Sequence, residues 1–280
     1  MTEGPIEYHL ESPGRGTLRA LRWEVDRPRG RVGIVHGLGD HAARYDHVAR
    51  DLAKRRFAVE AIDLPGHGKS YGARGHVGAW DEYRAALDLW MGEMAGRPGG
   101  ERIALLGHSM GGFVALDWAL RNPGRLRALI LSAPPFELVL RPSMLKVRAA
   151  QVAARFWPGF SQGNMILPSM LSHDQAMIRD HMNDPLVHYR ISARLFLEFQ
   201  RVRAALTRNA PELPVDTLLL QGGSDPISAP AGATRWARSA APGRLRLCLY
   251  PGFLHEVLHE AERARVLADL GDWLDTTFPD

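Results

Sequence analysis

Short apolar runs alternate with segments of helical periodicity along most of this 280-residue chain. Runs at 31–36, 57–62 and 103–106 are examples, and helical patterns with apolar residues three or four positions apart follow them. The run at 103–106 is apolar at every position, which is typical of a strand buried on both faces, as in a parallel sheet. The alternation therefore predicts an α/β fold, with a mostly parallel sheet and helices on both of its faces.

Two segments depart from this alternation. Strand-like runs at 6–10 and 18–25 flank Pro13-Gly14-Arg15-Gly16, and this spacing predicts an N-terminal hairpin. After Pro135 no strand-like run occurs until Val215, which is far more chain than a crossover helix needs. We expect residues 1–135 and 207–280 to form one core, and residues 136–206 to form a mostly helical insertion, or cap, with a functional role.

Composition narrows the classes of protein. Hydrophobic residues make up 45% and charged residues 24%, as in ordinary globular chains, and no apolar stretch reaches the ~20 residues of a membrane helix. The N-terminus has no basic region followed by an apolar one, and the single Cys248 cannot form an internal disulfide, so we expect a cytoplasmic protein. The net charge is +4, but the arginines are scattered, so we expect no nucleic-acid partner.

The segment 107–111, Gly-His-Ser-Met-Gly, has the form G-x-S-x-G and lies between a buried-type strand and an apolar helix. In that context the motif predicts a strained strand-to-helix turn that exposes a nucleophilic serine at the carboxyl edge of a sheet. Glycines on either side remove Cβ atoms that would clash in such a turn. We therefore predict that Ser109 is a nucleophile.

A serine nucleophile needs a base, and the base needs an orienting acid. Asp225 follows the predicted strand at 215–220, and His255 follows the one at 245–250, so both should reach the edge where Ser109 emerges. Asp216 is the rival acid but lies at the opposite end of its strand. His108 is the rival base, and we interpret it as a packing residue because adjacent side chains in such a turn point apart.

Acyl transfer also requires donors for the oxyanion of the tetrahedral intermediate. His36-Gly37-Leu38-Gly39 follows the third predicted strand, where this architecture supplies one amide. We expect the backbone N–H groups of Leu38 and Met110 to be the two donors. His36 itself is interpreted as a buried structural histidine.

One motif suggests different chemistry. Residues 255–259 read His-Glu-Val-Leu-His, the zinc-peptidase pattern, which works only when both histidines share a helix face. Pro251-Gly252 lies just upstream and favours a loop at His255, so we expect no metal site and no organic cofactor. Three further histidines are interpreted as surface residues of the insertion: His173, His181 and His188.

Several motifs, in the same order, resemble the monoacylglycerol lipase and lysophospholipase branch of the α/β-hydrolases. They are His36-Gly-Leu-Gly-Asp-His41 with Arg44-Tyr45, Asp63-Leu-Pro-Gly-His-Gly68 with Ser70, Arg74-Gly-His-Val77, Gly107-His-Ser-Met-Gly-Gly112, Gly222-Gly-Ser-Asp-Pro226 and His255-Glu256. The resemblance implies an α/β-hydrolase fold with a helical cap, and a serine esterase without cofactors. It also implies Ser109 as nucleophile, Asp225 as acid, His255 as base, and Leu38 and Met110 as oxyanion donors.

The substrate expected from this resemblance is a monoacylglycerol, lysophospholipid or related fatty-acyl ester. A short-chain carboxylesterase, a peptidase of the proline-iminopeptidase type and a non-catalytic binding module are the alternatives. Five methionines and a stripe of apolar residues in the insertion favour a long apolar acyl pocket, and its basic amphipathic helix also suits contact with an anionic membrane. The stripe consists of Leu145, Ala149, Val152 and Phe156. The sequence does not indicate an oligomeric state.

Overall fold

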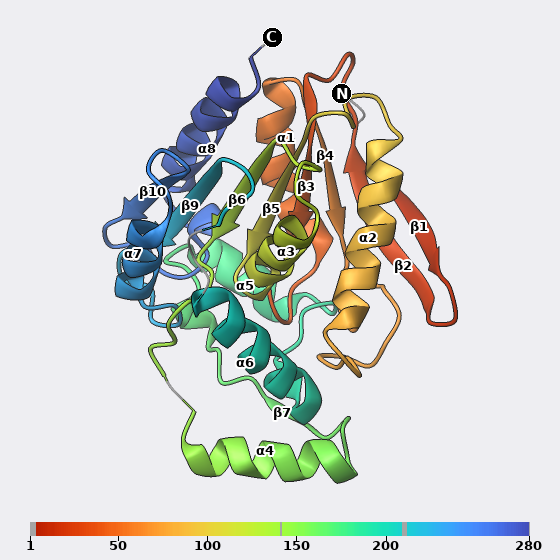
Figure 1. The fold of residues 1–280 in the computed structure, drawn as a ribbon, viewed down its shortest axis with the longest axis vertical. Coiled ribbons are helices and arrows are strands. Elements are labelled where there is room, and N and C mark those ends of the chain that lie inside the picture. The colour runs from red at the N-terminus through yellow and green to blue at the C-terminus, as the bar shows by residue number, and fades with distance from the viewer. Residues whose placement is uncertain (1–3, 141, 209–211, 280) are drawn as a thin grey trace.

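The computed structural model describes residues 4–140, 142–208 and 212–279, so the first three residues of the N-terminal segment lie outside its described part. An eight-stranded sheet with the order β1-β2-β4-β3-β5-β6-β9-β10 forms the centre (Figure 1). β2 is antiparallel to both β1 and β4, and the six strands β4, β3, β5, β6, β9 and β10 run parallel to one another. Its strands are β1 (Ile6–Ser12), β2 (Gly16–Trp23), β3 (Gly30–Val35), β4 (Phe57–Ile62), β5 (Ile103–His108), β6 (Ala128–Ser132), β9 (Thr217–Gly222) and β10 (Leu245–Tyr250).

Helices cover both faces of the sheet, and β3, β4, β5, β6 and β9 are buried at every residue. One face packs against α2 (Asp81–Ala95), α3 (Met110–Arg121) and α7 (Pro230–Ser239), in a core that includes Trp90 and Phe113. The other face packs against α1 (Asp46–Lys54) and α8 (Arg263–Thr277). Burying a large apolar side chain contributes about 1.5–3 kcal/mol, so continuous apolar strands stabilise this three-layer arrangement.

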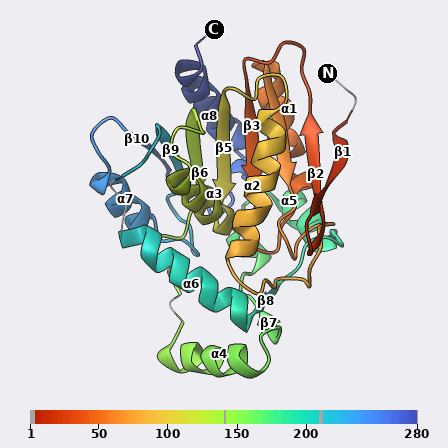
Figure 2. The ribbon, with the colours of Figure 1, turned by 45° about the vertical axis from the view of Figure 1, so that its right-hand side comes forward.

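The insertion contains six elements at the carboxyl edge of the parallel strands. α6 packs on α3, whereas α4 lies farthest from the sheet, beyond α6 (Figures 1 and 2). Only Ala154 of α4 is buried, compared with four residues of α6. The elements are α4 (Met144–Phe156), β7 (Ser161–Gly163), η2 (Pro168–Met170), α5 (Gln175–Asn183), β8 (Arg190–Ser192) and α6 (Ala193–Arg208).

Three sequence expectations about these elements need correction. The sequence of 257–278 predicts one last helix, but the structure has a short 3₁₀ turn, η3 (Val257–His259), followed by α8, because the buried Glu260 carboxylate accepts N–H groups of Leu254 and His173 and stabilises a turn. The insertion also contains a two-stranded antiparallel ribbon, β7 with β8, whose strands have only three residues each. Thirdly, the apolar stripe of α4 faces outward: Leu145 is 77% exposed and Phe156 is 63% exposed.

Candidate active site

Ser109 sits in a strained turn between β5 and α3. Its φ of 52° and ψ of −119° lie in a region that side-chain-bearing residues rarely adopt. The turn needs glycine on both sides: a Cβ at position 107 would lie 2.3 Å from the Gly111 carbonyl oxygen, and one at position 111 would lie 2.3 Å from that of His36. The G-x-S-x-G pattern therefore has a direct steric cause, and the turn places the serine just beyond the end of β5.

Three residues from three loops meet at this edge of the sheet. His255 Nε2 is 2.9 Å from Ser109 Oγ, and His255 Nδ1 is 2.8 Å from Asp225 Oδ2. Asp225 follows β9 and His255 follows β10, so the parallel register of these strands brings both residues to the serine. All three side chains are largely withdrawn from solvent. The geometry can carry a proton from the serine hydroxyl to the imidazole.

Asp225 and His255 shift one another's pKa. Burial alone raises the pKa of the Asp225 carboxyl, but the facing His255 and the backbone N–H groups of Ile227 and Ser228 keep this pKa below its ordinary value. Burial alone lowers the pKa of His255, yet the Asp225 carboxylate raises it above 6.5. Asp225 therefore remains ionised and makes His255 a stronger base.

Gln221 is a site residue that the sequence reasoning missed. Its Nε2 donates to Asp225 Oδ2 at 2.9 Å and also to the carbonyl oxygens of Gly222 and Ser228. Its signal in the sequence is only its position in the last two residues of β9, where a polar side chain interrupts an apolar strand. Four hydrogen-bond donors thus surround the Asp225 carboxylate and fix its orientation.

The two predicted oxyanion donors flank the serine. Leu38 follows β3, and Met110 is the first residue of α3. Within the described residues, neither backbone N–H donates to a carbonyl group elsewhere in the fold. Both residues also line the cavity that contains Ser109. Two amide groups are therefore available for an oxygen that binds next to the serine.

The rival residues have other partners. His108 Nδ1 lies 3.1 Å from Ser132 Oγ, and burial lowers the pKa of His108 to about 4. Asp216 pairs with Arg244 at 2.9 Å on an exposed surface, before β9 begins. His36 is buried, and its Nε2 accepts the N–H of Leu64. The buried position expected for His36 is confirmed, and His108 is buried as well, with its ring centroid 5.1 Å from that of His255.

The two histidines of the zinc-peptidase pattern point to separate partners. His255 lies in a loop and faces Ser109, whereas His259 Nε2 is 3.1 Å from the Arg44 carbonyl oxygen. In the described part of the chain, no three His, Cys, Asp or Glu side chains are grouped as metal ligands. The surface location expected for His181 and His188 is wrong: His181 is buried, and the half-buried His188 donates its backbone N–H to the Gly39 carbonyl oxygen at 2.9 Å.

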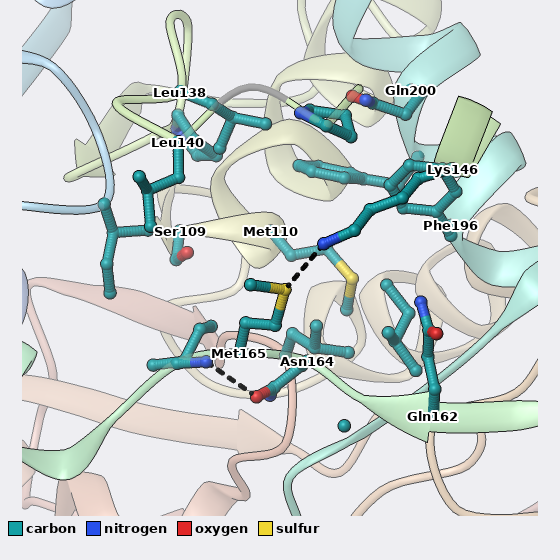
Figure 3. A pocket seen from close by; sticks show the side chains of 18 of the residues that line it. Ser109, Met110, Leu138, Leu140, Lys146, Gln162, Asn164, Met165, Phe196 and Gln200 are labelled. Carbon is teal, nitrogen blue, oxygen red and sulfur yellow. Dashed lines mark hydrogen bonds between the residues drawn. The ribbon is translucent and has the colours of Figure 1, made fainter. Parts of the chain in front are cut away.

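An apolar cavity of about 230 Å³ opens beside Ser109. Figure 3 shows Met165, Phe196 and Leu138 around it, and the Lys146 side chain extending across it to within 3.7 Å of Met165 Sδ. No aspartate or glutamate is among its described lining residues. Of the five insertion methionines that were expected to line an acyl pocket, Met165 and Met170 are among the described residues that line this cavity, and Met144, Met177 and Met182 are not.

A second, more polar cavity, with a volume of only about 30 Å³, meets the first at Ser109. Leu38 and His255 also border it, together with polar residues of the core and of the insertion. Three of its lining residues carry a buried polar atom with no hydrogen-bond partner within the described structure: His181 Nδ1, His188 Nε2 and Tyr189 Oη. Its polar lining consists of Asp40, His108, Asn164, His181, His188, Tyr189 and Glu256.

A mostly parallel sheet with helices on both faces, carrying a serine on a strained turn beside a histidine and an aspartate, defines a serine hydrolase with the α/β-hydrolase fold. Comparison with known proteins agrees with this class. Residues 26–262 match the family described as serine aminopeptidase, S33. The chain belongs to that family, and within it to the branch that resembles monoacylglycerol lipases.

The relatives are similar over most of their length. A monoacylglycerol lipase of Mycolicibacterium smegmatis is 31% identical over 255 residues, 90% of each chain. The phospholipase YtpA of Bacillus subtilis is 28% identical, over 87% of this chain and 94% of its own. The crystal structure of a Paleococcus ferrophilus monoacylglycerol lipase superposes with a TM-score of 0.85 at 30% identity, over 93% of this chain and 99% of that one. The protein is an ester-hydrolysing enzyme.

Proposed function

We propose that this enzyme hydrolyses monoacyl esters of glycerol, of glycerophosphate headgroups or of related polar alcohols, with medium or long acyl chains. The observation that carries the proposal is the pair of cavities that meet at Ser109, one apolar and one polar. An ester bound across the serine would place its acyl chain in the first and its alcohol in the second. The monoacylglycerol lipases and the phospholipase among the relatives support this substrate class.

The proposed reaction passes through an acyl-enzyme. His255 accepts the Ser109 hydroxyl proton as Oγ attacks the ester carbonyl, and the N–H groups of Leu38 and Met110 stabilise the oxyanion. His255 then donates the proton to the alcohol oxygen, which leaves. A water molecule, deprotonated by the same imidazole, attacks the acyl-serine. The imidazolium then returns the proton to Ser109 Oγ as the bond to the acyl group breaks, and the fatty acid is released. Asp225 holds the imidazole in the required tautomer throughout.

The lining of the polar cavity favours binding of a small alcohol that carries hydroxyl or charged groups. An alcohol hydroxyl there can donate to His181 Nδ1 or bond to Tyr189 Oη, and so supply partners for two buried groups that have none in the described structure. A buried polar group without a partner costs about 1–3 kcal/mol, so an alcohol that satisfies it binds more tightly than an alkyl group of similar size.

The same lining argues against the peptidase alternative. An aminopeptidase must bind the free ammonium group of its substrate, and a carboxylate is the usual partner of a buried ammonium. The apolar cavity has no described carboxylate, and both carboxylates of the polar cavity, Asp40 and Glu256, already pair with Arg44. A neutral ester matches this charge distribution better than an N-terminal amine does.

We further propose that residues 136–206 form a cap that contacts membranes through α4, at the cytoplasmic surface. The outward side chains Leu145, Val152 and Phe156 are more than half exposed, and α4 has basic but no acidic residues. Such a helix binds an anionic lipid surface through apolar burial and charge attraction. Within the described residues no helix has both the length and the apolar composition to cross a bilayer.

Charged substitutions on α4 test the membrane contact. Sedimentation with anionic phospholipid vesicles should recover less of the Leu145→Glu/Val152→Glu variant than of the wild type, with the activity on a dispersed short ester unchanged. Leu249→Glu, on the exposed edge strand β10, is the matched control and should bind like the wild type. Equal recovery of all three proteins would exclude α4 as the contact surface.

The substrate proposal is tested with Ser109→Ala and a series of p-nitrophenyl esters. The variant should lose labelling by a fluorophosphonate probe, whereas retained labelling would exclude Ser109 as the nucleophile. For the wild type, each methylene contributes up to ~0.8 kcal/mol of binding, or about a fourfold gain in kcat/KM, until the cavity is full. A profile that peaks at acetyl or propionyl esters would leave a short-chain carboxylesterase.

A further inference from the structure

Arg44 is a buried cation that joins separate parts of the chain. It lies on the 3₁₀ turn η1 (Ala42–Tyr45) and pairs with Asp40 at 3.0 Å and with Glu256 at 2.8 Å. All three side chains are less than a tenth exposed. Its Nη2 also lies 3.2 Å from Met177 Sδ of α5. One guanidinium thus contacts the loop after β3, the loop after β10 and the insertion.

The two carboxylates are close in sequence to groups of the proposed mechanism. Asp40 is two residues beyond Leu38, and Glu256 directly follows His255. We propose that Arg44 is a positioning residue, which fixes the loop carrying the Leu38 N–H relative to the loop carrying His255. This inference rests on the proposed function, because it concerns the alignment of the oxyanion donor with the base.

The backbone contacts of the two loops include long bonds as well as short ones, such as the 2.9 Å bond from the His188 N–H to the Gly39 carbonyl oxygen. The Asp40 N–H reaches the Gly37 carbonyl oxygen at 3.4 Å, and the His255 N–H reaches that of Met170 at 3.4 Å. A shorter bond of 2.8 Å, from the Glu256 N–H to Leu171, connects the histidine loop to the insertion. Charge-assisted bonds to a guanidinium are stronger and more directional than these neutral contacts. The Arg44 pairs therefore link the loop after β3 to the loop after β10.

The charges of this cluster are mutually stabilised. Burial alone raises the pKa of both carboxyls, but the facing Arg44 lowers the pKa of Glu256 to about 2 and that of Asp40 well below its ordinary value. Both carboxylates therefore stay ionised, and the planar fork of Arg44 donates to Glu256 from two nitrogens, at 2.8 and 3.2 Å. A point charge such as an ammonium cannot reproduce that geometry.

The first experiment replaces Arg44 with a side chain of similar volume and no charge. In Arg44→Met we expect kcat on a p-nitrophenyl ester to fall about 10²-fold, the usual consequence of a misplacement near 1 Å, with KM changed less than about threefold. Arg31→Met is the matched control: Arg31 is equally buried and pairs with Glu60 at 2.6 Å and Glu24 at 2.8 Å, but at the opposite end of β3. It should lower Tm similarly and leave kcat of the folded enzyme unchanged.

A charge-neutral triple variant separates positioning from charge compensation. Arg44→Met alone leaves two buried carboxylates unpaired and can fail to fold, whereas Asp40→Asn, Arg44→Met and Glu256→Gln together leave no unpaired charge. We expect this triple variant to fold and to keep the low kcat. Recovery of kcat to within about threefold of the wild type would overturn the positioning role, as would an unchanged kcat in folded Arg44→Met. Ser109→Ala is measured in parallel: activity retained there would refute the proposed mechanism itself.

Discussion

Replacing Asp225 with asparagine is the sharpest test of the proposed base and acid. The amide has nearly the same shape, and its oxygen can still accept the N–H groups of Ile227 and Ser228, now 2.8 and 2.9 Å from Asp225 Oδ1. Its NH₂ group must then face His255 Nδ1 and Gln221 Nε2. Gln221 cannot easily turn, because the same Nε2 also donates to two backbone carbonyl oxygens.

The substitution should invert the histidine tautomer. With an amide N–H as its neighbour, His255 Nδ1 accepts a hydrogen bond, and the ring proton moves to Nε2, 2.9 Å from Ser109 Oγ. An Nε2–H donates to the serine and cannot accept its proton. Loss of the carboxylate from a serine triad lowers kcat about 10⁴-fold, which corresponds to about 5.4 kcal/mol of transition-state stabilisation.

The assay compares kcat for a p-nitrophenyl ester and the rate of fluorophosphonate labelling in Asp225→Asn and the wild type. Both should fall by a similar factor, and circular dichroism should report a folded protein. Asp216→Asn is the control, since Asp216 pairs with Arg244 on the surface, and its kcat should be unchanged. If Asp225→Asn kept more than about a tenth of the wild-type kcat, the tautomer argument would be refuted.

Three further predictions follow from the site. The base must be neutral, and the Asp225 carboxylate raises the pKa of His255. The value of kcat/KM should therefore fall as the pH drops through that pKa, with its half-point above pH 6.5. A half-point below pH 6.5 would contradict the assignment of His255 as the base. Gly111→Ala places a Cβ 2.3 Å from the His36 carbonyl oxygen. Urea unfolding should therefore show a free energy of unfolding lower by several kcal/mol, or the variant should lack activity. Wild-type stability and activity would exclude the steric argument. Prolonged dialysis against EDTA or phenanthroline should leave kcat unchanged, and recovery that requires zinc would contradict the serine mechanism.

Periodicity was sufficient for the core of the fold. The predicted strands at 57–62 and 245–250 coincide with β4 and β10, because a short, mostly apolar run flanked by turn residues has few alternatives in a chain of this kind. Parallel strands end at one edge of a sheet, and this rule predicted, without any contact information, that Asp225 and His255 lie near Ser109. The strand prediction depends on local sequence alone. The prediction of a shared edge depends on the handedness of βαβ units, which varies little among folds.

The insertion was less predictable for physical reasons. The stripe of α4 shows which side chains share a face of the helix, but periodicity does not reveal what that face meets, and Leu145 and Val152 turned out to face outward. The strands β7 and β8 are too short to show an alternating pattern. Tertiary contacts bury His181 and half-bury His188, which the polarity of a single histidine does not predict.

The two cavities also bear on how many acyl chains the proposed substrate carries. With one chain in the apolar cavity, a triacylglycerol would have to place two further chains near the polar cavity, whose wall includes Asp40, His181 and Glu256. An alkyl chain there would keep His181 Nδ1 without a partner and would separate the wall from water, at a cost of about 1–3 kcal/mol for each such group. A free hydroxyl or a phosphate avoids that cost. The division of the site into an apolar and a polar side therefore favours monoacyl over triacyl substrates, independently of any steric barrier from the insertion.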